Sequence, residues 1–274
     1  MKHSVAFFAA RAVGAFLLLS SCATPAAMPD PGPVTVPATP PVTPPATDIS
    51  YPGQVLDLSK WKLTLPIGAP EKPDEVFQPQ LNTFANSSFF RLNATNDAVL
   101  FRANADGVTT NGSGYPRSEL REMTVPATSN SYKASWSSGS GTHTLLIDQA
   151  VTHLPDVKKH IVVGQIHDAD DDIIVFRLED KKLFINLNGK NGPTLTSNYA
   201  LGTRFTVQFV VANDKTDCYY NGTKVYTYAK SFSGAYFKAG AYVQSSCVDD
   251  KKVAGELCSA YGEVAIYNVQ VTHQ

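Results

Sequence analysis

The sequence predicts an all-β domain, a sandwich or jelly roll of two stacked sheets. Nine short segments are rich in β-branched and aromatic residues and often alternate apolar with polar positions. Turn dipeptides such as Asn-Gly and Asp-Gly separate them, and no segment has a sustained helical period except a short piece around residues 80–87. Many short strands at regular spacing are typical of sandwiches and jelly rolls. The predicted strands cover residues 61–67, 98–104, 161–167, 173–179, 182–188, 204–213, 224–230, 236–244 and 263–271.

The chain begins with features of a bacterial export signal. Lys2 and Arg11 precede the apolar run VGAFLLL, which is too short for a permanent membrane span. Leu19 lies three residues before Cys22 with only serines between, which resembles the lipobox of bacterial lipoproteins. We therefore expect residues 1–21 to be a lipoprotein signal peptide and Cys22 to be lipidated. Ala23 after it favours the outer membrane, so the expected location is the cell envelope.

Residues 22–50 have a different composition from the rest of the chain. They are rich in Pro, Ala and Thr and contain no aromatic residue, so they cannot bury a core. We interpret them as a semi-rigid linker and residues 51–274 as a single folded domain. Removal of residues 1–21 leaves 21 basic and 24 acidic residues, a net charge of −3. That balance does not indicate a nucleic-acid partner, and any anionic partner must meet a local basic patch.

Three predicted strands place unusual polar side chains on one face. In a strand, alternate side chains point to opposite faces. In RSELREM, Leu120 therefore faces away from the three charged positions of the segment, and in QIH, Ile166 faces away from its two neighbours. In YFKAGAYVQ, Phe237, Ala239 and Val243 form an apolar face. A face that is only solvated usually carries Lys, Thr, Ser and Glu, whereas this one carries Arg, Gln, His and Tyr, which suit recognition and proton transfer.

The three cysteines of the domain have different predicted roles. Cys247 and Cys258 flank a polar segment and form the expected disulfide, which is compatible with export. Cys218 lies in an apparent strand and is expected to be a buried free thiol. Metal-ligand spacing is absent from the sequence, so no metal site is predicted. The acidic run at 167–172 lacks the pattern of an EF-hand and is interpreted as a solvated turn at the rim of a concave face of one sheet.

The segments RSELREM, QIH and YFKAGAYVQ, in that order, resemble the three signature segments of the alginate lyases of polysaccharide lyase family seven. The opening VLDLSKWKLTLPIG and the closing EVAIYNVQV resemble that family's first and last strands, so the resemblance covers residues 51–274. It implies a jelly-roll β-sandwich with a concave substrate groove. It also implies β-elimination on an anionic polysaccharide, alginate, without a metal requirement. We expect a monomer without a cofactor.

The resemblance also implies roles for individual residues. Arg117 or Arg121, together with Gln165, would bind and neutralise the substrate carboxylate next to the cleaved bond. His167 would be the general base, at least for guluronate. Tyr242 would protonate the leaving oxygen, and for mannuronate it would act as both base and acid. An arginine suits a carboxylate because its planar fork binds both oxygens and stays charged.

Four further residues complete the predicted site. Glu119 would orient the two arginines, and Lys238, Gln244 and Tyr236 would contact sugars along the groove. Ile166 between Gln and His favours guluronate-containing blocks. Alternative functions are a lyase for another polyuronate such as glucuronan, a non-catalytic carbohydrate-binding module, and a glycoside hydrolase. A hydrolase usually needs two carboxylates across one bond, and no closely spaced acidic pair is expected on the groove face.

Overall fold

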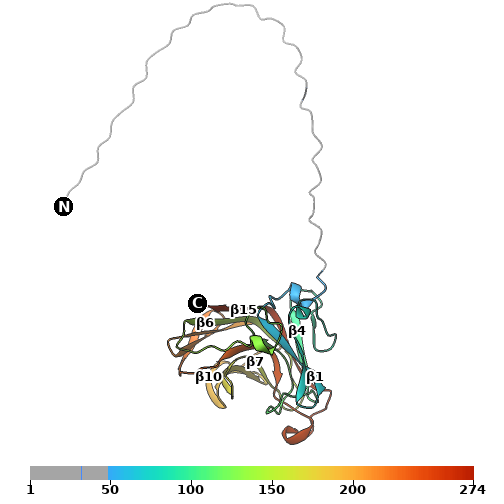
Figure 1. The fold of residues 1–274 in the computed structure, drawn as a ribbon. Helices are drawn as coiled ribbons and strands as arrows, with labels where there is room; N and C mark the ends of the chain where they lie inside the picture. The colour runs from blue at the N-terminus through green and yellow to red at the C-terminus, as the bar shows by residue number, and fades with distance from the viewer. Residues whose placement is uncertain (1–31, 33–48) are drawn as a thin grey trace, which may run out of the picture. The chain divides into compact units, whose positions relative to one another are not determined.

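The computed structural model describes Gly32 and residues 49–274, and within that range it confirms an all-β sandwich of two antiparallel sheets (Figure 1). The expected signal peptide, Cys22 and most of the expected linker lie outside the described residues. The first sheet has the order β10-β9-β8-β7-β14-β5-β1-β2 and the second β13-β12-β11-β6-β15-β4-β3. The strands of the first sheet are β1 (Trp61–Ala69), β2 (Lys72–Val76), β5 (Arg117–Glu122), β7 (His160–His167), β8 (Asp172–Glu179), β9 (Lys182–Leu187), β10 (Lys190–Thr196) and β14 (Tyr236–Val243). Those of the second are β3 (Phe90–Leu92), β4 (Val99–Asn104), β6 (Thr142–His153), β11 (Phe205–Ala212), β12 (Lys215–Tyr220), β13 (Thr223–Ala229) and β15 (Tyr261–His273).

Helical structure in this range is limited to four 3₁₀ turns, η1 (Pro52–Gln54), η2 (Gln80–Asn82), η3 (Asn130–Tyr132) and η4 (Asp249–Lys251). The helical piece expected around residues 80–87 is therefore a single short turn. None of the helices described here is long and apolar enough to cross a membrane.

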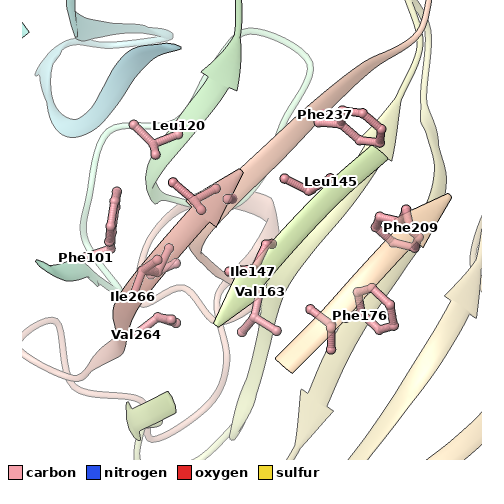
Figure 2. Packing of buried hydrophobic residues seen from close by; sticks show 14 of the residues in the cluster. Phe101, Leu120, Leu145, Ile147, Val163, Phe176, Phe209, Phe237, Val264 and Ile266 are labelled. Atoms are coloured by element: carbon pink, nitrogen blue, oxygen red, sulfur yellow. The ribbon is translucent and has the colours of Figure 1, made fainter. Parts of the chain in front are cut away.

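The core lies between the two sheets and follows the predicted alternation. Leu120 and Phe237 from the first sheet are fully buried, as are Leu145 and Phe209 from the second (Figure 2). Burying a large apolar side chain stabilises a fold by about 1.5–3 kcal/mol. The same alternation that sends these residues inward turns their polar neighbours on β5, β7 and β14 to the opposite face of the first sheet.

The register of the three central strands brings the polar residues together. Across β14 and β5, Tyr242 lies opposite Arg117, and Gly240 lies opposite Glu119. Gly240 has φ +142°, and a Cβ there would lie 2.5 Å from the Ser118 carbonyl oxygen. Only glycine fits this close approach between the two strands, so Gly240 lets β14 pack against β5 directly beside Glu119.

A buried carboxylate ties β5 to the start of β14 and to the last strand. Glu122 accepts hydrogen bonds from the Trp136 indole at 3.0 Å and the Phe237 amide at 2.8 Å. Its other oxygen lies 2.6 Å from His273 Nε2, and His273 Nδ1 lies 2.7 Å from His143 Nδ1. This network fixes the end of β5 against the start of β14, at one end of the paired strands that carry the candidate site.

The structure joins Cys247 and Cys258 in a disulfide, the pairing expected for the loop they flank. Cys218 is a buried free thiol. Within the disulfide loop, Lys251 packs its aliphatic stem against Gly114, where a Cβ would lie 2.3 Å from the Lys251 Cγ. The disulfide loop therefore supports the segment that precedes β5.

Candidate active site

A groove of about 840 Å³ lies over β1, β5, β7 and β14 on the face opposite the core. Seven of the predicted site residues line it: Arg117, Arg121, Gln165, His167, Tyr236, Lys238 and Tyr242. Glu119 lies beneath them with 1% exposure. Gln244 lies just beyond the end of β14 and is not among the lining residues. The structure therefore brings together every predicted groove residue except Gln244.

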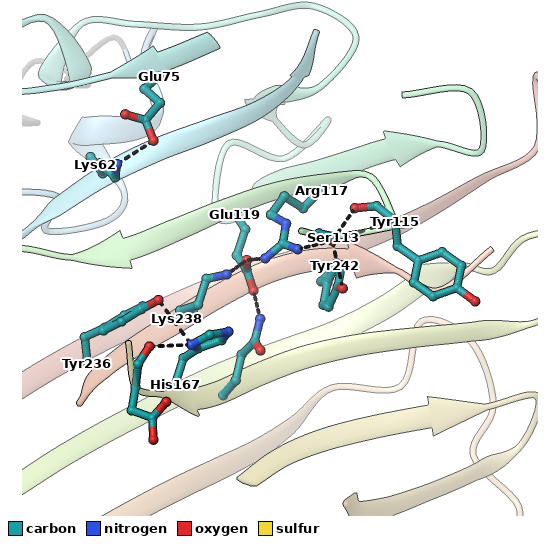
Figure 3. A network of polar contacts seen from close by, with 12 residues as sticks. Lys62, Glu75, Ser113, Tyr115, Arg117, Glu119, His167, Tyr236, Lys238 and Tyr242 are labelled. Carbon is teal, nitrogen blue, oxygen red and sulfur yellow. Dashed lines mark hydrogen bonds and ion pairs between the residues drawn. The ribbon is translucent and has the colours of Figure 1, made fainter. Parts of the chain in front are cut away.

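Glu119 is the centre of the polar network (Figure 3). One carboxylate oxygen lies 2.6 Å from Lys238 Nζ and 3.3 Å from Arg117 Nη1, and the other accepts a short hydrogen bond from the Gln165 amide. Burial works to raise the pKa of Glu119, but Lys238 and Arg117 outweigh it and hold that pKa below its usual value. The residue is therefore a buried anion that fixes three donors at the floor of the groove.

The expectation that Glu119 orients both arginines is wrong for Arg121. Arg121 instead donates to the Glu122 carbonyl at 2.5 Å and the Ala134 carbonyl at 3.2 Å. Its guanidinium also stacks on the Tyr236 ring at 3.9 Å. The second cation on Glu119 is Lys238, which lies directly opposite Arg121 on the neighbouring strand.

Arg117 has free donor capacity beside Tyr242. Its Nη1 pairs with Glu119 and its Nη2 donates to Ser113 Oγ at 2.8 Å, while the buried Nε has no hydrogen-bond partner among the described residues. The guanidinium lies 3.9 Å from the centre of the Tyr242 ring. Each terminal nitrogen carries a second hydrogen, so the guanidinium can still donate to a carboxylate that enters the groove it lines.

The hydrogen bonds of His167 define which ring nitrogen is free. Nδ1 lies 2.7 Å from the Asp168 carbonyl oxygen, which can only accept, so Nδ1 carries the hydrogen. The lone pair of the neutral ring is then on Nε2. Burial and the nearby Lys238 lower the pKa of His167, which keeps the ring neutral near pH 7. A neutral imidazole with a free Nε2 can accept a proton.

The Tyr242 hydroxyl contacts a loop in which no site residue was predicted from the sequence. The hydroxyl lies 3.1 Å from Ser113 Oγ, in the segment between β4 and β5. Lys133, Lys251 and Tyr115 also line the groove and were not predicted. All four lie outside regular strands, where alternation gives no information about the direction of a side chain.

The acidic run lies at the rim of the groove, as expected. The expectation that the groove face has no closely spaced acidic pair is wrong. Asp170, Asp171 and Asp172 line the groove, so a closely spaced acidic pair is present on this face. Burial and a hydrogen bond with Asp171 raise the pKa of Asp172 to about 6. The two carboxyl groups face each other on one rim rather than across the groove.

Within residues 49–274, no group of three or more His, Cys, Asp or Glu side chains is arranged to hold a metal ion.

The comparisons with known proteins agree with this geometry. The family model described as alginate lyase matches residues 56–273. The structure is similar to alginate lyase AlgAT5 from polysaccharide lyase family 7, with 51% identity, a TM-score of 0.76, and coverage of 82% of this chain and 99% of the other.

Two further solved structures extend the similarity. The alginate lyase from Corynebacterium sp. is 49% identical with a TM-score of 0.78, and the match covers 83% of this chain and all of that one. Alginate lyase A1-II′ is 27% identical with a TM-score of 0.67, covering 82% and 99%. The comparison with curated proteins found no match. The family match over nearly the whole domain and the high identity to solved relatives show that this chain belongs to the alginate lyases of polysaccharide lyase family 7.

Proposed function

We propose that this alginate lyase cleaves at guluronate-containing blocks through Arg117, Gln165, His167 and Tyr242, and that it acts as a monomer. One observation carries the assignment of roles: the four side chains come from three strands and line one groove above the buried Glu119. Ile166, fully buried between Gln165 and His167, supports the preference for guluronate through the family resemblance.

The difficult step in this reaction is removal of the C5 proton of a uronate. That proton is very weakly acidic while the adjacent carboxylate is charged, so negative charge must be stabilised on the carboxylate as the proton leaves. Arg117 lines the groove, is held by Glu119 and Ser113, and keeps a second hydrogen on each terminal nitrogen. Arg121 has its guanidinium bound to two carbonyls. We therefore assign neutralisation of the carboxylate to Arg117, with Gln165 as a neutral donor.

The remaining residues move the protons. For guluronate, His167 Nε2 takes the C5 proton, the electron pair forms the C4–C5 double bond, and the C4–O bond breaks. Tyr242 gives its phenolic proton to the departing oxygen, and solvent restores both side chains. For mannuronate, a Tyr242 phenolate takes the C5 proton and then delivers it to the leaving oxygen. Either route yields one unsaturated and one saturated end.

The alternative functions lead to a direct test. A hydrolase gives only saturated ends, and a carbohydrate-binding module gives no new ends. Purified polyguluronate, polymannuronate and glucuronan should each be digested while near-ultraviolet absorbance and product size are followed. We expect an unsaturated chromophore that appears faster from polyguluronate. Equal or faster release from polymannuronate would refute the preference, and release from glucuronan alone would assign a different polyuronate.

The charge of Lys238 gives a prediction about pH. Burial and the nearby Arg117 lower the pKa of Lys238 to about 8, so this groove cation is lost as the pH rises through that value. We expect the KM for alginate to rise severalfold between about pH 7 and pH 9, since each lost contact with an anionic sugar weakens binding. Steady-state kinetics at fixed ionic strength will measure it.

Lys238→Met is the matched variant for this prediction. Methionine keeps the length of the apolar stem but carries no charge at any pH. Its KM should be raised already at pH 7 and should stay flat through pH 8. A wild-type KM that does not change through this range, or a variant that keeps the same rise, would contradict the assignment to Lys238.

We also propose that the enzyme is exported and held in the outer membrane through a lipid on Cys22, with residues 22–50 as the linker. The apolar run and the cysteine that ends it support this proposal. Labelled fatty acid should be incorporated into the full chain in a bacterial host and not into Cys22→Ser. Labelling of both or of neither would refute a lipid on Cys22.

A further inference from the structure

We propose that Ser113 is a positioning residue for Tyr242: through a hydrogen bond polarised by Arg117, it stabilises the phenolate form of the tyrosine during proton transfer. The inference rests on the proposed role of Tyr242 and adds a residue outside the three signature segments. It predicts that Ser113 contributes most on the substrate for which Tyr242 must act as the base.

The contacts of Ser113 connect two groups of the site. Its Oγ lies 2.8 Å from Arg117 Nη2 and 3.1 Å from the Tyr242 hydroxyl. The Tyr115 carbonyl oxygen is 3.3 Å away and the Tyr115 amide 3.4 Å away, both longer than the other two contacts. Ser113 is thus the link between a fixed cation and the phenolic oxygen.

The hydrogens of this link can be assigned by donor capacity. Arg117 has donors only, so the serine oxygen accepts from it. The single serine hydrogen is then free to point either to the Tyr115 carbonyl or to the Tyr242 oxygen. When Tyr242 is a phenol, it can donate to the serine. When it is a phenolate, Ser113 rotates its hydrogen toward the charge, and the guanidinium behind it strengthens that bond.

The loop around Ser113 is held in place from two sides. The Ser113 amide donates to the Thr110 carbonyl at 2.9 Å, and Thr109 and Pro116 form a bridge across the base of the loop. On the outer side, Lys251 packs on Gly114 from the loop closed by the disulfide. A positioning residue needs such a support, because a site loosened by about 1 Å loses much of its effect.

The charged groups around Tyr242 come from every neighbouring element. Arg117 on β5 stacks on its ring, and Lys238 on β14 itself has Nζ 5.9 Å from the ring centre. Glu119 lies beneath both cations, and His167 on β7 and Lys251 from the disulfide loop line the same groove. Ser113, which is uncharged, hydrogen-bonds to the phenolic oxygen of Tyr242 directly. This hydrogen bond can therefore be removed by substitution without changing the charge of the site.

Cleavage of mannuronate and cleavage of guluronate need opposite protonation states of Tyr242 at the start of the reaction. On mannuronate, the reaction needs the phenolate before the C5 proton is taken, so loss of the serine hydrogen bond disfavours the reactive form. On guluronate, the reaction needs the phenol as the acid, and His167 is the base. Removing Ser113 should therefore slow mannuronate cleavage at neutral pH more than guluronate cleavage, since both reactions lose the hydrogen bond that Ser113 accepts from Arg117 but only the mannuronate reaction needs the phenolate.

The experiment compares Ser113→Ala, Ser113→Thr and Ser87→Ala over a range of pH on both polymers. On polymannuronate, we expect kcat of Ser113→Ala to fall about tenfold to a hundredfold near pH 7, the loss expected for one hydrogen bond to an ionised group. Its rising limb should move to higher pH by about one to two units. On polyguluronate, we expect a smaller loss, below about tenfold, from the weaker support of Arg117. The falling limb on this polymer should also move to higher pH. Ser113→Thr keeps the hydroxyl and should recover most of the activity, and Ser87, exposed and outside the groove lining, should behave as wild type.

Each other result overturns the proposal. An equal loss on both polymers with unmoved limbs would assign Ser113 to the support of Arg117 alone, and wild-type kinetics in Ser113→Ala would leave it no role. If the wild type cleaves only one polymer, the proposal is tested by the limb of the pH profile that Tyr242 governs on that polymer. A limb that does not move in Ser113→Ala would then overturn the proposal.

A second measurement separates this inference from the proposed function. Ultraviolet titration of tyrosinate, taken as the difference between each protein and its Tyr242→Phe counterpart, does not depend on turnover. We expect the Tyr242 transition at higher pH in Ser113→Ala than in wild type, and an unchanged transition would refute the inference. Absence of unsaturated products from wild type on every polyuronate would refute the proposed function and leave the titration to decide on Ser113.

Discussion

Tyr242→Phe is expected to lower kcat on alginate by about a hundredfold to ten-thousandfold, the range for loss of a positioned acid or base, while oligosaccharide binding is retained. The change removes one oxygen and leaves the ring, so the stacking of Arg117 on it at 3.9 Å is preserved. No other phenol lies opposite Arg117 in the register of β5 and β14. Steady-state kinetics and calorimetric titration with a short alginate oligosaccharide would measure the two effects separately.

Two variants serve as controls for this experiment. Tyr236→Phe removes the corresponding oxygen from a tyrosine of the same strand and groove, whose hydroxyl lies 3.2 Å from His167 Nδ1. Because that nitrogen is not the proposed base, we expect a loss below about tenfold. His167→Asn should lower kcat on polyguluronate more than on polymannuronate. Cleavage by Tyr242→Phe at the wild-type rate would remove the tyrosine from the mechanism.

The faces of the central strands could be predicted from the sequence because the strand period is two residues. Leu120, Ile166 and Phe237 are fully buried between the sheets, and their polar neighbours line the groove or its floor. Predicting which face of a strand a side chain occupies needs no knowledge of which strands pair. It failed only for Gln244, because β14 ends at Val243 and the Gln244 amide bonds to the His160 carbonyl instead of continuing the pattern beside β5.

The partner of Glu119 could not be predicted in the same way. Within RSELRE, both arginines are two residues from Glu119 and are equivalent by spacing. Lys238 becomes its partner through the register of β14 against β5, and register depends on contacts far apart in the sequence. Local spacing gives the face of a strand, whereas the choice of ion pair across strands is a property of the folded sheet.

Ser113 illustrates a second limit. It lies in the segment TTNGSGYP, where two glycines and the lack of a repeating pattern leave the backbone path open. Only the folded loop shows that its hydroxyl reaches Tyr242. Residues on loops that complete a site are therefore found from the structure, even when the strands beneath them were predicted correctly.

Glu119→Gln is expected to lower the free energy of unfolding by about 3–5 kcal/mol, which corresponds to a fall in Tm of roughly 10 °C. Glutamine has nearly the same shape but no charge, so Arg117 and Lys238 lose their common anion. The side chains of these cations are only 8% and 9% exposed, and water cannot replace that anion. Thermal and urea unfolding of the two proteins, followed by circular dichroism, would measure the difference.

Asp148→Asn is the matched control, because it removes a carboxylate from an ion pair at the surface. Asp148 binds Arg204 at 2.6 Å, but the arginine side chain is 53% exposed, so a loss of at most about 1 kcal/mol is expected.

The pH dependence gives an independent check on Glu119. Its pKa is held below the ordinary value of 4.5, so its stabilising effect is present above that pH and is lost as the pH falls through the lowered pKa. The difference in stability between wild type and Glu119→Gln should therefore be largest near neutral pH and shrink on acidification. Equal stability of the two proteins at pH 7, or a difference that grows in acid, would show that the carboxylate does not hold the floor of the groove together.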